Sequence, residues 1–439
     1  MKRSLLLTSL LFAGVAVINS QEIQRCVTLP QGKEIYIPND LKGFNFNDSL
    51  SQWNYHNMSC TDNFVILWDN KFGDNLSDPP KLENKEMKVS LDNLRQRLEQ
   101  FYTFYRDELK FVLPGSKSEK YRMMLMLNYS LEGTAYGGDY DGQIGAMWVT
   151  PNRVQDERLN CIAHELGHSF QAQISCDKTG EAWGGCGFFE MTSQWMLWHV
   201  NPLWIKDELY HWQAFTKKTH KAYLHLDNIY HSPYVLEYWS QKHGLPVIAD
   251  LYRAGKKGED PITTYKRMFN LSQDQFCDEM YEASARIVNL DFNHAFDLTR
   301  EYANQFNAEL GNKNNKGWQR VIEKNCPENY GFNAIPIDIP NPGKKVAVSF
   351  QGETDIDGYR LKNIDKAGWR YGFVAVTEDN KSIYGETCKN NKGKITFKTP
   401  KDIKIKHLWL VVMGAPKEHY MLGENSGDHQ WPYSIKIEI

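Results

Sequence analysis

The chain has 439 residues, a length that corresponds to about three domains at roughly 150 residues each. Its 41% hydrophobic and 24% charged residues are typical of globular protein and exclude a disordered or collagen-like chain. The 51 Lys and Arg residues are balanced by 54 Asp and Glu residues, for a net charge of −3. With no basic excess or Lys/Arg-rich run, we expect no nucleic-acid partner.

The first 20 residues predict a signal peptide. Lys2 and Arg3 precede an apolar stretch over residues 5–18, and Ser20 marks the expected cleavage position. The stretch is short and interrupted for a membrane span, and no later segment reaches about 18 apolar residues; an uncleaved N-terminal anchor is the alternative to a signal peptide. We therefore expect a secreted protein, extracellular or periplasmic, with no transmembrane span.

Eight cysteines follow the signal, and an even number in an exported chain permits disulfides. Proximity in the sequence favours the pairs Cys26–Cys60 and Cys176–Cys186. No Cys-x-x-Cys motif occurs, so a thiolate zinc site or a thioredoxin-like redox pair has no support.

The next part of the chain, to about residue 155, alternates buried strands with a helix. Apolar runs at 64–68, 121–128 and 144–149 predict strands. Ser90 can cap a helix whose apolar residues recur at helical spacing until Pro114-Gly115 stops it. A Gly-rich segment, 133–142, leads into the third strand.

Residues 155–330 are mainly helical, with amphipathic stretches at 234–242 and 273–288. Three prolines in the nine residues 335–343 predict a linker, because proline fits neither a helix interior nor a central strand. Short alternating segments follow, separated by turn residues. They predict an antiparallel β-sandwich over 343–439, so the fold class is α+β.

The motif that indicates chemistry is His164-Glu165-Leu166-Gly167-His168. On a helix, the two histidines project from one face about one turn apart, so both imidazoles can bind one zinc ion. Glu165 can reach a metal-bound water as general base, since zinc lowers the pKa of that water to around 7. Apolar residues at positions 162, 166 and 170 predict the buried stripe that anchors this helix.

The third ligand decides the subclass. A metzincin would need Gly and a ligand at the positions of Gln171 and Ile174, so that class is excluded. Glu190, on the predicted helix 188–198, lies 22 residues after His168 and is the preferred third ligand. Glu181 is the alternative, but its Gly-rich turn offers no helix to hold it.

The pattern His164-Glu165-x-x-His168 with Glu190 downstream, after the strand 144–149, resembles the gluzincin zinc metallopeptidases. The resemblance is closest to secreted bacterial members with a C-terminal β-sandwich, and extends to enhancin and mucin-directed peptidases. It implies a catalytic domain over 21–335, with a sheet and helix part (21–155) and a helical part (156–335). It also implies that the strand 144–149 forms the sheet edge along which a peptide substrate lies.

Two further site features follow from the resemblance. Many gluzincins place an acid four residues after the third ligand to hold a ligand histidine; here Gln194 stands there, and its carbonyl can accept the same hydrogen bond. The oxyanion in this family is usually stabilised by a Tyr or His from a later helix. Tyr230, His231 and Tyr234 are the candidates.

We therefore expect a secreted zinc-dependent endopeptidase that hydrolyses extracellular proteins or glycoproteins. The alternative is a non-catalytic glycan- or protein-binding protein that retains a relic of the metallopeptidase fold. In that case the aromatic residues Trp369, Tyr371, Trp409 and Trp431 of the C-terminal sandwich could bind sugar; the other interpretation is that they belong to the core or pack against the catalytic domain.

Overall fold

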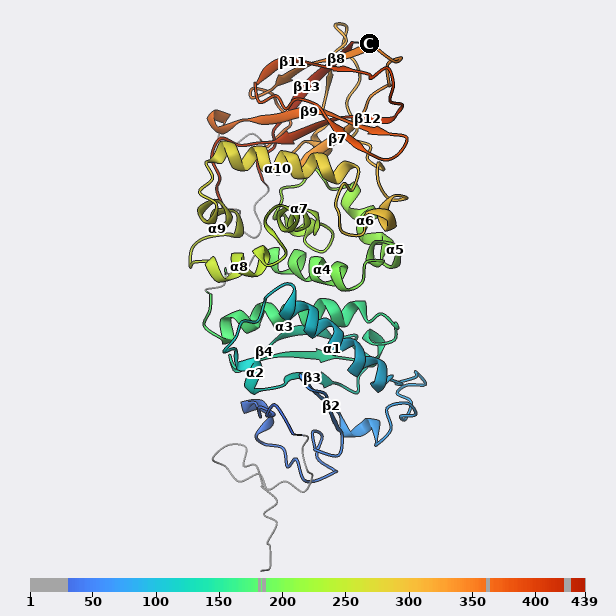
Figure 1. Cartoon of the computed structure of the whole chain (residues 1–439), viewed down its shortest axis with the longest axis vertical. Coiled ribbons are helices and arrows are strands. Elements are labelled where there is room, and N and C mark those ends of the chain that lie inside the picture. The colour runs from blue at the N-terminus through green and yellow to red at the C-terminus, as the bar shows by residue number, and fades with distance from the viewer. Residues whose placement is uncertain (1–30, 181–182, 184–186, 361–363, 422–427, 439) are drawn as a thin grey trace, which may run out of the picture.

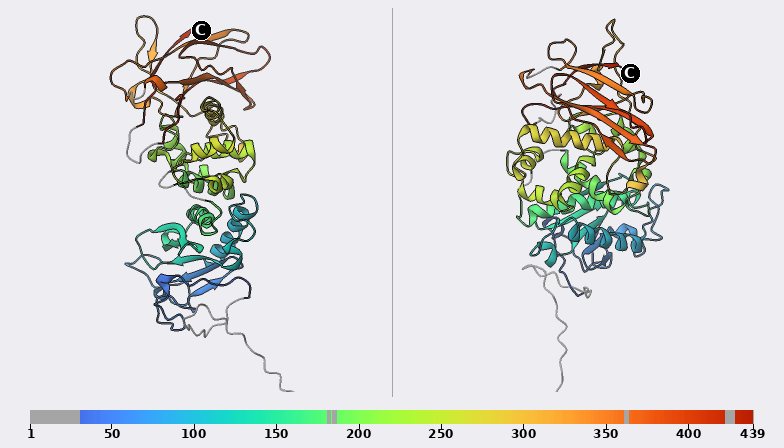
Figure 2. Two further views of the ribbon diagram at one scale, coloured as in Figure 1. Left: turned by 90° about the vertical axis from the view of Figure 1, so that its left-hand side faces the viewer. Right: turned by 45° about the horizontal axis from the view of Figure 1, so that its top comes forward.

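A computed structural model describes residues 31–180, 183, 187–360, 364–421 and 428–438. The molecule is elongated, with a mixed sheet at the N-terminal end, helices in the middle and a β-sandwich at the C-terminal end (Figure 1). The two further views in Figure 2 show the same order of layers. The expected signal peptide, Cys26, Glu181 and Cys186 lie outside the described residues, so neither expected disulfide is tested.

The N-terminal sheet has the strand order β1-β2-β3-β5-β4. The three inner strands run parallel, and the two edge strands pair antiparallel with their neighbours. The expected sheet edge at 144–149 is wrong: β5 lies inside the sheet, and the Gly-rich segment before it forms the edge strand β4. The bounds are β1 (Met58–Cys60), β2 (Phe64–Trp68), β3 (Met123–Leu127), β4 (Ala135–Tyr140) and β5 (Ile144–Val149).

Helices α1 and α3 lie between this sheet and the helical middle of the molecule (Figure 1). Helix α1 ends at Asp107, whereas the sequence predicts that it continues until Pro114. The chain leaves the helical conformation at Lys110, which has a φ of 58°. The helices of this part are α1 (Leu91–Asp107), α2 (Lys117–Lys120) and α3 (Asn160–Cys176).

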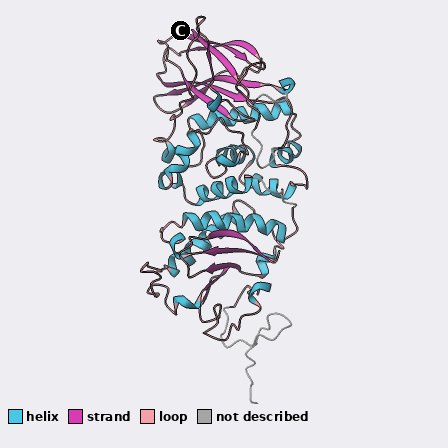
Figure 3. Ribbon diagram, turned by 180° about the vertical axis from the view of Figure 1, so that it is seen from behind, coloured by secondary structure: helices cyan, strands magenta, loops and turns pink. Residues whose placement is uncertain are grey.

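The middle layer is built around α7, which other helices surround in the view from behind (Figure 3). Tyr234 and Trp239 of α7 are fully buried. The predicted helices at 234–242 and 273–288 are confirmed by α7 and α10. The helices of the layer are α4 (Phe188–Val200), α5 (Trp204–Asp207), α6 (Leu209–Thr216), α7 (Tyr234–His243), α8 (Val247–Ala254), α9 (Pro261–Met268), α10 (Gln273–Val288) and α11 (Phe296–Thr299).

Short 3-10 turns join these elements at η1 (Asn39–Leu41), η2 (Asn70–Phe72), η3 (Pro151–Arg153), η4 (Leu226–Asn228), η5 (Glu323–Asn325) and η6 (Ile364–Lys366). No helix within the described residues is long and apolar enough to span a membrane.

The C-terminal part consists of two four-stranded antiparallel sheets, in the orders β10-β9-β12-β7 and β11-β8-β13-β6. Two strands come from before residue 343, and β7 overlaps the predicted linker. Proline is tolerated there because β7 is an edge strand that ends at Pro336. The bounds are β6 (Gln319–Arg320), β7 (Phe332–Pro336), β8 (Lys345–Gly352), β9 (Trp369–Thr377), β10 (Ser382–Tyr384), β11 (Lys392–Lys398), β12 (Ile405–Gly414) and β13 (Tyr433–Glu438).

The four sandwich aromatics that could have bound sugar are not on the surface. Trp369, Tyr371, Trp409 and Trp431 are all at most 4% exposed. Three of them fill the core between the two sheets, and Trp409 packs toward the helices. This sandwich therefore cannot stack a sugar on these rings.

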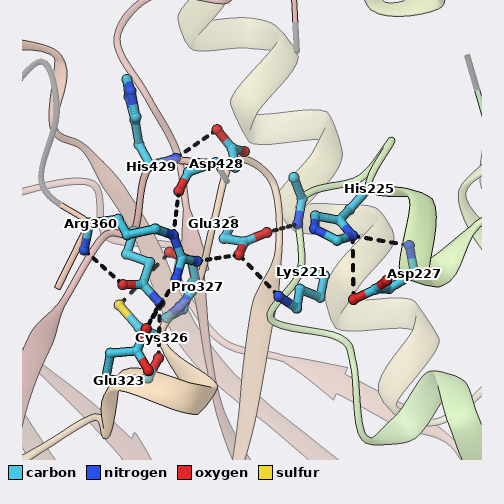
Figure 4. A network of polar contacts seen from close by, with 12 residues as sticks. Lys221, His225, Asp227, Glu323, Cys326, Pro327, Glu328, Arg360, Asp428 and His429 are labelled. Atoms are coloured by element: carbon cyan, nitrogen blue, oxygen red, sulfur yellow. Dashed lines mark hydrogen bonds and ion pairs between the residues drawn. The ribbon is translucent and has the colours of Figure 1, made fainter. Parts of the chain in front are cut away.

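A buried polar network joins the sandwich to the helical layer (Figure 4). The Glu328 carboxylate accepts hydrogen bonds from the Ala222 backbone N–H at 2.9 Å and from Arg360 at 2.7 Å. Asp428 accepts from the Asn329 N–H at 3.1 Å, and burial raises its pKa to about 6. Because each partner lies far away in the sequence, the network fixes how the two parts meet.

Candidate metal centre

Helix α3 presents the motif from a fixed position on the sheet. Ile162, Leu166 and Phe170 are fully buried, which confirms the predicted apolar stripe. Ser169 Oγ donates to the Ala146 carbonyl of β5 at 2.8 Å and ties the helix to the sheet. The opposite side of the helix therefore faces α4.

Two glycines allow the elements around the motif to approach closely. A Cβ on Gly167 would lie 2.8 Å from Ser193 Oγ of α4, and one on Gly137 of β4 would lie 1.9 Å from the Glu165 carbonyl oxygen. Larger side chains at these positions would push α4 or β4 away from α3. Gly167 of the motif therefore allows α3 and α4, the two helices that carry the candidate ligands, to pack closely together.

The three expected ligands converge on one point. Nε2 of His164 and Nε2 of His168 each lie 3.1 Å from Oε2 of Glu190, and the two nitrogens are 3.2 Å apart. Within the described part of the chain, these residues form the one group of three or more His, Cys, Asp or Glu with ligand atoms this close together.

Two glutamines determine which nitrogen of each histidine faces the group. Gln194 Oε1 lies 3.2 Å from Nδ1 of His164, and Gln171 Oε1 lies 3.2 Å from Nδ1 of His168. The amide nitrogens of Gln194 and Gln171 donate to the backbone carbonyls of Tyr230 and Phe189 at 2.9 and 3.0 Å. The carbonyl oxygens must therefore face the histidines.

It follows that both histidines carry their proton on Nδ1 and donate it to a glutamine. Their Nε2 lone pairs then point at each other and at the Glu190 carboxylate. A cation shared between the three lone pairs would stabilise this arrangement. Two imidazole nitrogens and one carboxylate oxygen form the donor set of a catalytic zinc site, so the residues fit this metal.

The electrostatics of the group agree with a cation site. Burial of Glu190 opposes its negative charge, but the imidazoles of His164 and His168 beside it keep the pKa of its carboxyl well below the usual range. Burial alone would lower the pKa of His164, and the adjacent carboxylates of Glu190 and Glu165 raise it instead. The carboxylate is therefore ionised and available to a metal.

A cleft of about 470 Å³ opens beside this group. The cleft is lined by β4, by residues of α3 that include Glu165, and by Tyr230. The Thr150 N–H donates a hydrogen bond to the Thr134 carbonyl at 3.0 Å. In an antiparallel pair every second residue directs its N–H and C=O groups to the partner strand, so those of residues 136 and 138 face β5. The alternate positions 135, 137 and 139 turn theirs to the free edge of the sheet.

The three candidates for oxyanion stabilisation lie in different places. Tyr230 lines the cleft, with its ring centroid 6.2 Å from that of His164. Burial and the nearby charge of Glu190 raise the pKa of its phenol to about 12, so it keeps its proton. His231 is not among the residues that line the cleft, and its Nδ1 lies 2.7 Å from Nδ1 of His211. Tyr234 is fully buried among aromatic side chains of the helical core and cannot reach a substrate.

Two residues of the site were not expected from the sequence in these roles. Gln171 orients His168, and its position three residues later on the same helix could have indicated the contact. Tyr136 of β4 is 61% exposed at the cleft and packs against Trp148 at 5.6 Å between ring centroids. No sequence signal marks it, because the Gly-rich segment does not predict a strand.

The chain belongs to DUF6055, a family of unknown function whose match covers residues 27–439. No curated protein matches it.

Proposed function

We propose that this protein is a secreted, zinc-dependent endopeptidase of the gluzincin type that hydrolyses extracellular proteins or glycoproteins. The observation that carries the proposal is the convergence of His164 Nε2, His168 Nε2 and Glu190 Oε2, with both Nδ1 protons accepted by glutamine carbonyls. A bound Zn²⁺ supplies Lewis-acid chemistry, lowering the pKa of a water and polarising a carbonyl.

The residues beside the ligands have roles that suit peptide hydrolysis. Glu165 is adjacent to a ligand histidine and lines the cleft without being a ligand. It takes the proton of the attacking water and returns it to the leaving amine. The protonated phenol of Tyr230 donates to the oxygen that becomes negative in the tetrahedral intermediate.

The edge strand β4 supports a peptide as the substrate. Its free backbone groups at positions 135, 137 and 139 can pair with an extended chain laid along the cleft. Such pairing uses only hydrogen bonds to the substrate backbone, so it would place a scissile carbonyl against α3 without requiring a particular substrate sequence. The non-catalytic alternative has no support from the aromatic residues of the sandwich, because these side chains are buried and cannot contact a glycan.

The substitution Glu165→Gln tests the reaction. We expect it to retain zinc and to reduce hydrolysis of a fluorogenic peptide library by about 10²–10⁴-fold, because only the proton acceptor is removed. Zinc content and hydrolysis are measured on the same preparations. Undiminished hydrolysis by the zinc-loaded variant would refute the role of Glu165 and with it the proposed mechanism.

A further inference from the structure

The outer face of the sheet β11-β8-β13-β6 carries lysines on three adjacent strands. The register places Lys398 opposite Lys345, and Lys394 and Lys436 on either side of Ser349. Lys392 lies opposite Gln351 at the other end of the same strands. We call the five lysines 345, 392, 394, 398 and 436 the basic face.

The alternation of the strands explains why these side chains share one face. Val346, Val348 and Phe350 of β8 are buried in the sandwich core, so the residues between them point outward. With about 3.4 Å per residue over β8, the basic face extends over about 20 Å and three strands in width. It lies at the C-terminal end of the molecule, far from the metal centre (Figure 1).

Internal ion pairs leave part of this charge uncompensated. Glu438 pairs with Lys394 and also lies 3.6 Å from Lys436. In the described part of the chain, Lys345, Lys392 and Lys398 form no ion pair, and neither do the neighbouring Lys344 and Lys401. Asp402 is the acid in the adjoining loop.

Two like charges directly opposite each other on a sheet destabilise it. Lysines on an edge strand such as β11 prevent the strand from pairing with another chain. This reason does not apply to Lys345 and Lys436, because β8 and β13 are inner strands. The charge is also segregated along the chain: residues 343–439 contain 16 Lys or Arg and 12 Asp or Glu, a net +4, which leaves −7 for the rest of the total of −3.

The side chains between the lysines indicate the kind of anion. Ser349, Gln351 and Thr396 offer hydroxyl and amide groups for hydrogen bonds. The described strands β8, β11 and β13 have no large apolar residue among the strongly exposed ones, so the face offers neither a stacking platform for nucleobases nor an apolar anchor for a membrane.

We propose that the basic face binds an acidic polysaccharide, one whose chain carries carboxylate or sulfate groups at regular intervals. The lysines contact the anionic groups, and the small polar side chains of β8 and β11 contact the sugar hydroxyls. This binding is independent of the metal centre and would hold the cleft near glycan-coated material.

The full-length protein is titrated with heparin and with polygalacturonate by calorimetry at several salt concentrations. We expect binding that weakens steeply between about 50 and 200 mM salt. The double variant K345E/K398E should weaken it at least tenfold with unchanged folding by circular dichroism. The matched control K256E/K257E, two exposed lysines in the helical part, should bind like the unmodified protein.

Three outcomes would overturn the proposal: no binding to either polysaccharide, equal losses in the two double variants, or equal affinity for duplex DNA or anionic lipid vesicles. Glu165→Gln should bind polysaccharide normally, so failure of this proposal is distinguishable from failure of the peptidase proposal.

Discussion

At the scale of single residues, the neutral partners of the two histidines distinguish this centre. Gln194 and Gln171 each accept a hydrogen bond from an imidazole N–H without adding a negative charge. A site with one carboxylate ligand and two neutral acceptors leaves more of the positive charge of a divalent metal uncompensated than a site with a charged acceptor. A zinc ion held there would lower the pKa of a water that it binds more strongly than a site with a charged acceptor would.

Removing the acceptor should loosen the metal. Gln194→Leu keeps the size of the side chain but leaves Nδ1 of His164 without its partner, so we expect zinc affinity to fall about 10–100-fold. Competition with a chromophoric chelator measures this without any assay of activity. Gln194→Glu, which restores an acceptor, should bind zinc at least as tightly as the unmodified protein; equal affinities for all three proteins would contradict the role of Gln194.

At the scale of elements, the edge strand β4 and the helix α3 define the cleft through one close contact. Gly137 leaves room for the Glu165 carbonyl, and any side chain there would collide with helix backbone that cannot move aside. The cleft therefore depends on a glycine that has no chemical role.

Gly137→Ala should destabilise the fold by about 1–3 kcal/mol and lower peptide hydrolysis, since β4 must move off α3. Urea denaturation of the zinc-free protein measures the first effect. Gly43→Ala is the matched control, because nothing lies within 4 Å of a Cβ at that position. Equal stability of the two variants would mean that β4 is not held where the structure places it.

Strands β2 and β5 and helices α7 and α10 were predicted at or within one residue of their bounds, because continuous apolar runs and helical periodicity are local signals. Strand β4 was missed because its stability comes from pairing with β5 and packing on α3, which no local pattern records. The same limit applies to Tyr234, whose helix was predicted but whose burial depends on tertiary packing.

At the scale of the whole molecule, buried histidines couple folding to pH. Burial lowers the pKa of His220 and His294 to about 4, below the value of about 6.5 for an exposed histidine. Between these values the unfolded chain binds more protons, so the free energy of unfolding falls as the pH decreases from about 6.5 to 4. Asp428, with a pKa raised to about 6, has the opposite effect and partly offsets this loss.

His294→Gln should therefore reduce the pH dependence of stability between pH 4.5 and 6.5, by up to about 1.4 kcal/mol per pH unit. The measurement is the free energy of unfolding, obtained by urea denaturation at several pH values, and its slope against pH is compared between the two proteins. Zinc is removed beforehand so that metal release does not contribute. Gln can donate to the Trp198 carbonyl as His294 does at 3.2 Å. An unchanged slope would show that His294 does not titrate differently in the folded protein.

The most direct test of the metal centre is the zinc content per chain, measured by plasma mass spectrometry on protein purified without added metal. The variant His164→Ala and the control His407→Ala are measured beside the unmodified protein. His407 is a partly exposed histidine of the sandwich, remote from the site. We predict about one zinc per chain in the unmodified and control proteins and almost none in His164→Ala. No zinc in the unmodified protein, even after reloading, or the same zinc content in all three, would contradict the metal centre and the proposed function.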